Sequence, residues 1–353
     1  MRLEKRPAIS RTAQVVAPLG AVAFTLLITA LLVLWAGKPV GQTYALLFKG
    51  GFGSVFALSE TFTRAIPLML TGLAAAVAFR ARLFNIGAEG QLYAGALAAI
   101  AVGGLHGGAG FDAPTWVLFP TMMLAAALAG ALLLLGPALL KAKLGVDEVV
   151  TTLLLNFIVL LGVGVLLDGA MKDPTAMGWP QSVALNPALE LAKLVEQTRV
   201  HTGLIWGGVL AVGLWVLMNH TVLGFDIRAV GANPRAAAFA GVGTTRTLVM
   251  VALLSGALAG LAGAIEVAGR TSYVTLDMSP GYGYSGIVIA MLAGLHPLGV
   301  VLASVFVAGV LVGADSMSRA IGVPTYLADV IVATSLIAVL VAMLAAQYRV
   351  RWK

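Results

Sequence analysis

The feature that most limits the possible folds of this chain is its repeated pattern of long apolar segments. Segments such as 116–135 and 149–167 contain no Asp, Glu, Lys or Arg. An α-helix needs about 20 consecutive, mostly apolar residues to cross the hydrocarbon core of a bilayer. Only 10% of the 353 residues are charged and 60% are hydrophobic, whereas soluble domains carry about 25% charged residues. The sequence therefore predicts an all-α, polytopic membrane protein.

The apolar segments predict about ten transmembrane helices within one transmembrane domain, 1–353. We expect broken helices near 80–90, where two arginines interrupt the apolar sequence, and near 294–299, where Gly and Pro do so. The longest polar interval, 168–202, is expected to carry one short surface helix. The predicted spans are 14–37, 64–79, 83–103, 116–135, 149–167, 204–219, 248–268 and 326–346, and the run 284–313 is either two spans or two half-helices joined by the break.

The positions of the basic residues predict which loops face the cytosol. Most Lys and Arg residues fall at the two termini and in alternate loops, at 80–82, 141–143 and 221–246. Short cytoplasmic loops of membrane proteins carry such an excess of basic residues. We therefore expect both termini in the cytosol. The net charge of +7 is then a topology signal that requires no nucleic-acid partner, and membrane lipid would cover the apolar surface.

The sequence offers no recognisable catalytic or cofactor chemistry. It contains no cysteine, so it has no disulfide, thiol nucleophile or thiolate metal site. Its four histidines are scattered without metal-ligand spacing, and the phosphate-binding pattern GxxxxGK[ST] does not occur. We therefore predict no catalytic residues, no metal and no cofactor, and the chain is not expected to be an enzyme.

A polar interval at 221–246 separates two apolar segments and contains the signals of a short helix. Asn233 can cap the start of the helix, and Pro234 suits the first helical position, where its missing N–H costs nothing. Gly241 can adopt the left-handed conformation that ends a helix. An isolated helix of this length is not stable in water, so it needs a supporting surface. It is either a connector on the membrane surface or a docking helix for a cytosolic partner.

The same interval resembles part of a known protein family. The run from Phe225 to Ala237 is similar to the cytosolic coupling loop of ABC-importer permeases, in the family that handles nucleosides, simple sugars and branched-chain amino acids. The resemblance implies that 221–246 is a coupling loop that binds a cytosolic ATPase. The residues expected in that contact are Arg228, Gly231, Asn233, Pro234, Arg235, Ala237, Ala238, Phe239 and Gly241.

The motif Asn-Ile-Gly-Ala-Glu-Gly-Gln, which begins at Asn85, places polar side chains in an apolar span. Asn85, Glu89 and Tyr93 are each four residues apart, so they share one helix face. A carboxylate at membrane depth is costly and normally faces a cavity or a partner. Two interpretations stay open: Glu89 pairs with Arg80 or Arg82 at the membrane edge, or the face lines a transport path. The motif resembles the NIGxEGQ stretch of nucleoside-type permeases.

A second motif, GVDEVVTTLLLN, begins at Gly145. Asp147 can cap the following helix, and Glu148 near the helix start is electrostatically favourable. Glu148, Thr152 and Asn156 share one face. They serve either in capping and interhelical hydrogen bonding or in a transport path. The motif resembles the family pattern GxNEVxxTLxxN, with Asp147 where Asn is usual, a change that keeps the capping chemistry.

Glycine and proline also interrupt the apolar sequence between 280 and 299. Irregular backbone at membrane depth is tolerated only where it lines a cavity or is buried in protein. Tyr282 and Tyr284 are candidates to contact a sugar or a base, and His296 stands where family members often have Asn. Packing is an equally good role for each. The complete set of candidate transport-path residues is Asn85, Glu89, Gln91, Tyr93, Thr152, Asn156, Tyr282, Tyr284 and His296.

The resemblance implies a permease subunit of a bacterial ABC importer, most similar to nucleoside permeases, in the cytoplasmic (inner) membrane. It further implies a cytosolic ABC ATPase subunit, a second permease subunit, identical or paralogous, and an extracytoplasmic substrate-binding protein or lipoprotein. A simple-sugar or branched-chain amino-acid permease is the nearest alternative. An ion-driven secondary carrier is a more distant one, because it needs ionisable residues at mid-membrane, whereas the acidic residues here fall mostly near span ends.

Overall fold

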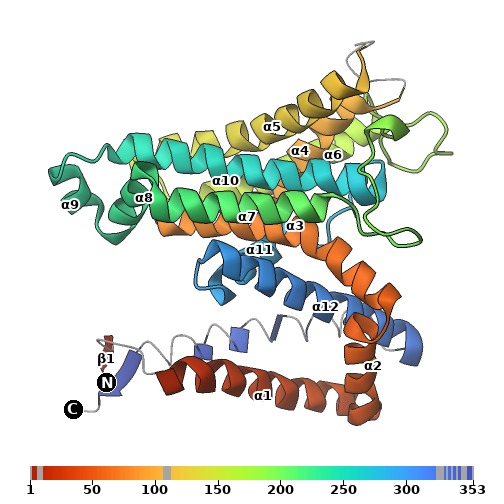
Figure 1. The fold of residues 1–353 in the computed structure, drawn as a ribbon, viewed down its shortest axis with the longest axis horizontal. Helices are drawn as coiled ribbons and strands as arrows, with labels where there is room; N and C mark the ends of the chain where they lie inside the picture. Colours follow the sequence, from red (N-terminus) through yellow and green to blue (C-terminus); the bar gives the residue numbers. More distant parts are fainter. Residues whose placement is uncertain are drawn as a thin grey trace. The chain divides into compact units, whose positions relative to one another are not determined.

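The computed structural model describes residues 2–5, 11–105 and 113–322, together with positions 330, 333–334, 337–338, 341–342 and 348–351. These residues form mostly α-helices (Figure 1), which confirms the predicted helical class. The strands among them are β1 (Arg2–Lys5) and β2 (Tyr348–Arg351), which pair antiparallel. The predicted span 326–346 lies largely outside the described residues.

Most helices follow the predicted segments in order, but α2 lies outside them and α3 begins at Val55 rather than near 64. Their bounds are α1 Arg11–Trp35, α2 Val40–Phe52, α3 Val55–Arg80, α4 Ala88–Gly103, α5 Thr115–Leu144, α6 Glu148–Asp168, α7 Gly203–His220, α8 Val222–Ala232, α9 Pro234–Phe239, α10 Thr244–Glu266, α11 Tyr282–Leu292 and α12 Pro297–Ile321, with a 3₁₀ turn η1 at Pro187–Leu189 and a π turn η2 at Val267–Thr271.

The described helices do not provide ten clear crossings. Six are long and apolar enough to cross a membrane, or seven if α1 and α2, bent by 116° at their junction, count as one span. Helix α11 has only 11 residues, so it is about 16 Å long, roughly half the thickness of the hydrocarbon core. The run 284–313 is therefore one short helix and one long helix rather than two full spans.

By contacts between its residues, the chain divides into two compact units. The first comprises Met1–Thr61 and Phe306–Lys353. Within it, α2 and the second half of α12 touch backbone to backbone. A Cβ added at Gly51 would lie 2.3 Å from the carbonyl oxygen of Gly309, and one added at Gly313 would lie 2.1 Å from that of Leu47. Only glycine permits so close an approach between two helices.

The second unit, Phe62–Val305, is built around α4, α5 and α10. A Cβ added at Gly95 of α4 would lie 2.1 Å from the carbonyl oxygen of Gly260 in α10. One added at Gly130 of α5 would lie 2.2 Å from that of Gly256, also in α10. Small residues therefore let three helix backbones meet, which is how helices associate in lipid without a hydrophobic driving force.

Two segments shape the candidate site: one contains the break expected near 80–90, and the other departs from the predicted structure. The predicted span 83–103 is helical only from Ala88, and residues 81–87 are a turn followed by non-helical backbone. The interval 221–246 forms two consecutive helices, α8 and α9, where the sequence predicted one. The side chain of Thr221 caps α8, since its Oγ1 accepts a hydrogen bond from the N–H of Gly224 at 3.1 Å.

Candidate functional site

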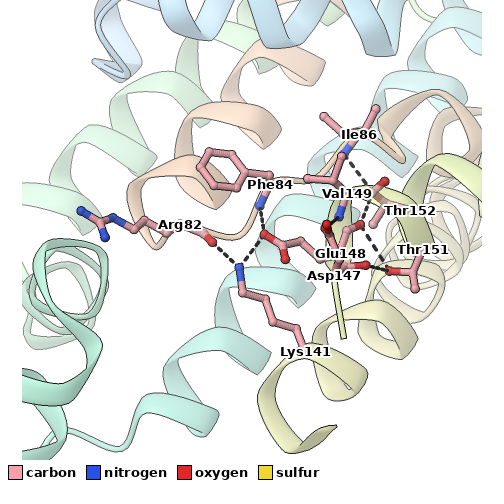
Figure 2. A network of polar contacts seen from close by, with 9 residues as sticks. All are labelled: Arg82, Phe84, Ile86, Lys141, Asp147, Glu148, Val149, Thr151 and Thr152. Atoms are coloured by element: carbon pink, nitrogen blue, oxygen red, sulfur yellow. Dashed lines mark hydrogen bonds and ion pairs between the residues drawn. The ribbon is translucent and has the colours of Figure 1, made fainter. Parts of the chain in front are cut away.

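The polar face of α6 holds the non-helical segment that joins α3 to α4 (Figure 2). The carboxylate of Glu148 accepts a hydrogen bond from the N–H of Phe84 at 3.0 Å and pairs with Lys141. The ammonium of Lys141 also donates to the carbonyl oxygen of Arg82. Asp147 caps α6 by accepting from the N–H of Val149. The predicted cap is therefore confirmed, and Glu148 bonds the backbone of the break.

Thr152 and Asn156 extend this role one and two turns further along α6. The hydroxyl of Thr152 accepts from the N–H of Ile86 at 3.2 Å. The side-chain oxygen of Asn156 accepts from the N–H of Gly90 at 2.8 Å, while its amide nitrogen donates to the carbonyl oxygen of Ile86 at 2.8 Å. Non-helical backbone at membrane depth must have its polar groups satisfied by protein. The side chains of Thr152 and Asn156 on α6 provide these hydrogen-bond partners.

Asn85 and Gln91 form a buried pair of amides. Asn85 Nδ2 donates to Gln91 Oε1, and Gln91 Nε2 donates to Asn85 Oδ1, both at 2.9 Å. Asn85 also donates to the hydroxyl of Ser255 in α10, which in turn donates to the carbonyl oxygen of Ala74 in α3. Both amide side chains are fully buried. Their hydrogen bonds tie the break to three helices, a structural role that the sequence did not reveal.

Glu89 lies where two helices begin. It occupies the first turn of α4 and accepts a hydrogen bond from the N–H of Gly283, in the first turn of α11, at 2.6 Å. A Cβ added at Gly283 would lie 2.2 Å from the nitrogen of Glu89, so the two helix starts touch. The positive ends of two helix dipoles therefore meet at one carboxylate, an arrangement that stabilises its charge. Glu89 contacts α11 rather than an arginine at the membrane edge.

The start of α11 lies deep in the second unit. The hydroxyl of Thr71 in α3 donates to the carbonyl oxygen of Tyr282 at 2.9 Å. Thr71 stands about 14 Å along the axis of α3 from its end at Arg80, well inside that helix. The hydroxyl of Tyr93 donates to the carbonyl oxygen of Leu276 and accepts from the N–H of Ser279. These bonds fix the irregular backbone that precedes α11.

The nine candidate path residues fall into two groups by exposure. Two are exposed: Tyr284, whose side chain reaches the amide nitrogen of Asn156 at 3.2 Å, and His296, in the turn after α11. Tyr284 is 38% exposed. The structure brings all of them except His296 together around the break and the start of α11. The buried group is Asn85, Glu89, Gln91, Tyr93, Thr152, Asn156 and Tyr282.

The interval 221–246 confirms the predicted short helix, α9. Asn233 accepts hydrogen bonds from the N–H groups of Arg235 and Ala236, at 3.1 and 3.2 Å, with Pro234 as the first helical residue. Gly241 has φ +86°, the expected left-handed conformation. Asn233 also ends α8. One asparagine therefore sets both the end of one helix and the start of the next.

One side of α9 faces the protein and the other faces outward. Ala237 is buried, whereas Arg235 and Ala238 are exposed. The ring of Phe239, also on the outward side, is 96% exposed. Gly231 at the end of α8 packs against α3, where an added Cβ would lie 1.8 Å from the carbonyl oxygen of Arg80.

The opposite end of the second unit contains a buried histidine that the sequence did not single out. His201, immediately before α7, accepts from the N–H of Gly203 through Nδ1 at 3.2 Å and is almost fully buried. Burial first, and the positive charge of Arg270 second, lower the pKa of His201 to about 4. Arg270 forms an ion pair with Glu266 and donates to the carbonyl oxygen of Met278. No local sequence signal distinguishes His201 from the other histidines.

Comparison with known proteins identifies relatives along nearly the whole chain. Residues 57–340 match the family model of the permease component of branched-chain amino acid transport systems. The chain is 35% identical to the guanosine ABC transporter permease protein NupP of Bacillus subtilis, over 98% of this chain and 97% of that protein. It is 30% identical to the nucleoside ABC transporter permease protein NupB of Lactococcus lactis, over 92% and 90%. A glucose ABC transporter permease of Haloferax volcanii is 37% identical over 88% and 82%.

Proposed function

This chain belongs to the family of permease components of branched-chain amino acid transport systems, and we propose that it imports nucleosides as the permease subunit of a bacterial ABC importer. The similarity to guanosine and nucleoside permeases over most of each chain supports this substrate class. The glucose permease relative keeps a simple sugar as the alternative substrate. A nucleoside carries both a ribose and a base, so the two proposals share sugar recognition and differ in the base.

The proposed importer has the parts that the sequence predicted. A cytosolic ABC ATPase binds the coupling loop 221–246, a second permease subunit completes the pore, and an extracytoplasmic binding protein or lipoprotein delivers the substrate. The chain crosses the cytoplasmic membrane as one permease domain, with both termini in the cytosol. The half-length of α11 supports a path with irregular backbone at its centre, because such backbone is stable only beside protein or a water-filled cavity.

Tyr284 is the residue that we propose to contact substrate. It is exposed while its neighbours around the break are buried, and its hydroxyl is held by Asn156. An aromatic ring can stack on a nucleobase, and a held hydroxyl can bond a ribose. The seven buried residues build the wall behind it, and His296 stands at the far end of α11.

The observation that carries the importer proposal is the exposed face of α9. A six-residue helix is not stable alone, and here Asn233 and the packing of α8 hold it in place. It can therefore transmit force to α8 and α10, which adjoin it directly. Arg235 and Phe239 offer one positive charge and one aromatic ring to a groove on the ATPase that is acidic or polar at one end and apolar at the other.

Co-purification with a candidate ATPase tests this assignment. We expect Ala238→Trp and Arg235→Glu to reach the membrane at normal levels, to bind the ATPase weakly and to import little substrate. Added bulk blocks a close-packed contact, and charge reversal places like charges together. Ala170→Trp and Lys143→Glu, at exposed positions outside the loop, are the matched controls. Wild-type binding and uptake in both loop variants would show that 221–246 is only a connector.

Two further measurements separate the alternatives. Uptake of radiolabelled nucleosides, competed by excess ribose, glucose or free base, defines the substrate class, and competition by glucose but not by other nucleosides would favour the sugar alternative. Uptake that persists without ATP but stops when the proton gradient collapses would identify an ion-driven carrier instead. A third measurement tests the topology. The chain has no cysteine of its own, so a single cysteine introduced at position 235 can be labelled selectively. If position 235 faces the cytosol, this cysteine should resist an impermeant thiol reagent in intact cells.

A further inference from the structure

Helix α11 meets an ionisable side chain of suitable sign at each end. At its start, the carboxylate of Glu89 accepts from the N–H of Gly283 at 2.6 Å. Beyond its end, Nε and Nη2 of Arg80 both donate to the carbonyl oxygen of Leu295 at 3.3 Å. An acidic group at a helix start and a basic group at a helix end both stabilise the helix dipole. These two residues, Glu89 and Arg80, flank the break between α3 and α4.

Arg80 is also the point where the coupling loop touches the membrane helices. The backbone of Gly231 at the end of α8 approaches the carbonyl oxygen of Arg80 so closely that an added Cβ would lie 1.8 Å from it. The guanidinium of Arg228, also in α8, repels that of Arg80 electrostatically. Nη1 of Arg228 is buried and lacks a hydrogen-bond partner among the described residues. The position of α8 therefore acts on both the backbone and the side chain of Arg80.

We propose that Arg80 is the positioning residue that transmits movement of the coupling loop to α11 and thereby to the centre of the transport path. This inference rests on the proposed function, because it assumes that an ATPase moves α8 and α9. When α8 shifts, the backbone of Arg80 shifts with it. Through its hydrogen bonds to the carbonyl oxygen of Leu295, the guanidinium of Arg80 moves α11 in the same direction. The start of α11 then shifts relative to Glu89 and α4.

The contacts favour movement of α11 as one body. Its ends are bonded to α3 and α4 through Arg80, Thr71 and Glu89, and an 11-residue helix is too short to bend appreciably without a break in its hydrogen bonds. Tyr284 belongs to its first turn, so a displacement of α11 moves the exposed phenol within the path. Without the guanidinium, α8 could move while α11 stayed in place.

The test measures substrate imported per ATP hydrolysed by the complete importer in proteoliposomes. Arg80→Gln should keep ATPase binding and hydrolysis but lower this ratio by about tenfold or more, the size expected when a hydrogen bond from a charged group is lost. Arg82→Gln is the matched control, because it removes the same charge from an exposed side chain two residues further along the chain. Its ratio of substrate imported to ATP hydrolysed should stay within about twofold of wild type. A purely structural role for Arg80 would lower assembly or lower both activities together.

A second pair of variants approaches the same link from α8. Gly231→Ala forces α8 away from Arg80 and should also lower the ratio, whereas Gly213→Ala, where an added Cβ meets nothing within 4 Å, should not. If Arg80→Gln fails to assemble, the amount of substrate imported per ATP hydrolysed by Gly231→Ala decides whether Arg80 links α8 to α11. Normal ratios in the assembled variants, beside an active wild type, would refute the role of Arg80. A wild-type complex that imports nothing with ATP would instead refute the proposed function.

Discussion

Replacement of Asn156 by leucine should destabilise the fold strongly, because the side chain bonds one backbone group of the break and one in the first turn of α4. It accepts from the N–H of Gly90 and donates to the carbonyl oxygen of Ile86, each at 2.8 Å. Asn156 is fully buried, so water cannot replace its amide. A buried backbone group without a partner costs about 1–3 kcal/mol. Two such groups give an expected loss of about 2–6 kcal/mol in the free energy of unfolding.

Reversible denaturation in detergent micelles, followed by tryptophan fluorescence, measures this loss. Asn219→Leu is the matched control, because Asn219 is exposed and its amide bonds a carbonyl of its own helix, that of Trp215. We expect that control to change the free energy of unfolding by less than about 0.5 kcal/mol. Equal losses in the two variants would refute the reasoning, since they would show that the backbone of the break does not depend on Asn156.

Two further predictions concern the close approach at Glu89 and the buried histidine. Gly283→Ala should lower the free energy of unfolding by about 1–3 kcal/mol, because an added Cβ would lie 2.2 Å from the nitrogen of Glu89, while Gly162→Ala, with nothing within 4 Å, should be neutral in the same denaturation assay. In the unfolded state the pKa of His201 is about 6.5. In the folded state, burial and then the positive charge of Arg270 lower that pKa to about 4. Stability should therefore fall as pH drops from about 6.5 to about 4, and it should fall less in His201→Gln. An identical pH dependence in that variant would contradict the assignment.

The sequence predicted those features of the fold whose determinants are local. Asn233 starts α9 by bonding the N–H of Arg235, two residues further along the chain. Asp147 caps α6 in the same way, by bonding the N–H of Val149. Long apolar runs likewise predicted α5, α6 and α7 to within a few residues at most ends, although α5 continues past Leu135 to Leu144. The polar face of Glu148, Thr152 and Asn156 was also predictable from its spacing.

The structure departs from the sequence predictions where distant residues decide the backbone. The break near 80–90 was expected but not its extent, because the predicted span began at 83, whereas α6, more than 60 positions further along the chain, bonds Phe84 and Ile86 as non-helical backbone. The length of α11 depends on Tyr93 and Thr71, which hold the segment before Tyr282 outside a helix. No pattern within 272–292 records those partners. The contact between Arg80 and Leu295 was hidden for the same reason, because the two residues lie 215 positions apart.

The meeting of α4 and α11 at Glu89 also sets a timetable for biosynthesis. Glu89 and its partner Gly283 are 194 positions apart. At about 5–20 residues per second, a ribosome completes α11 roughly 10–40 s after α4. During that interval the carboxylate of Glu89 in α4 and the amide of Asn85 in the break before it wait for partners in α11 and α10 that do not yet exist. Substitutions in α11 should therefore reduce the amount of protein through quality control of an orphaned α4, before any effect on import can be measured.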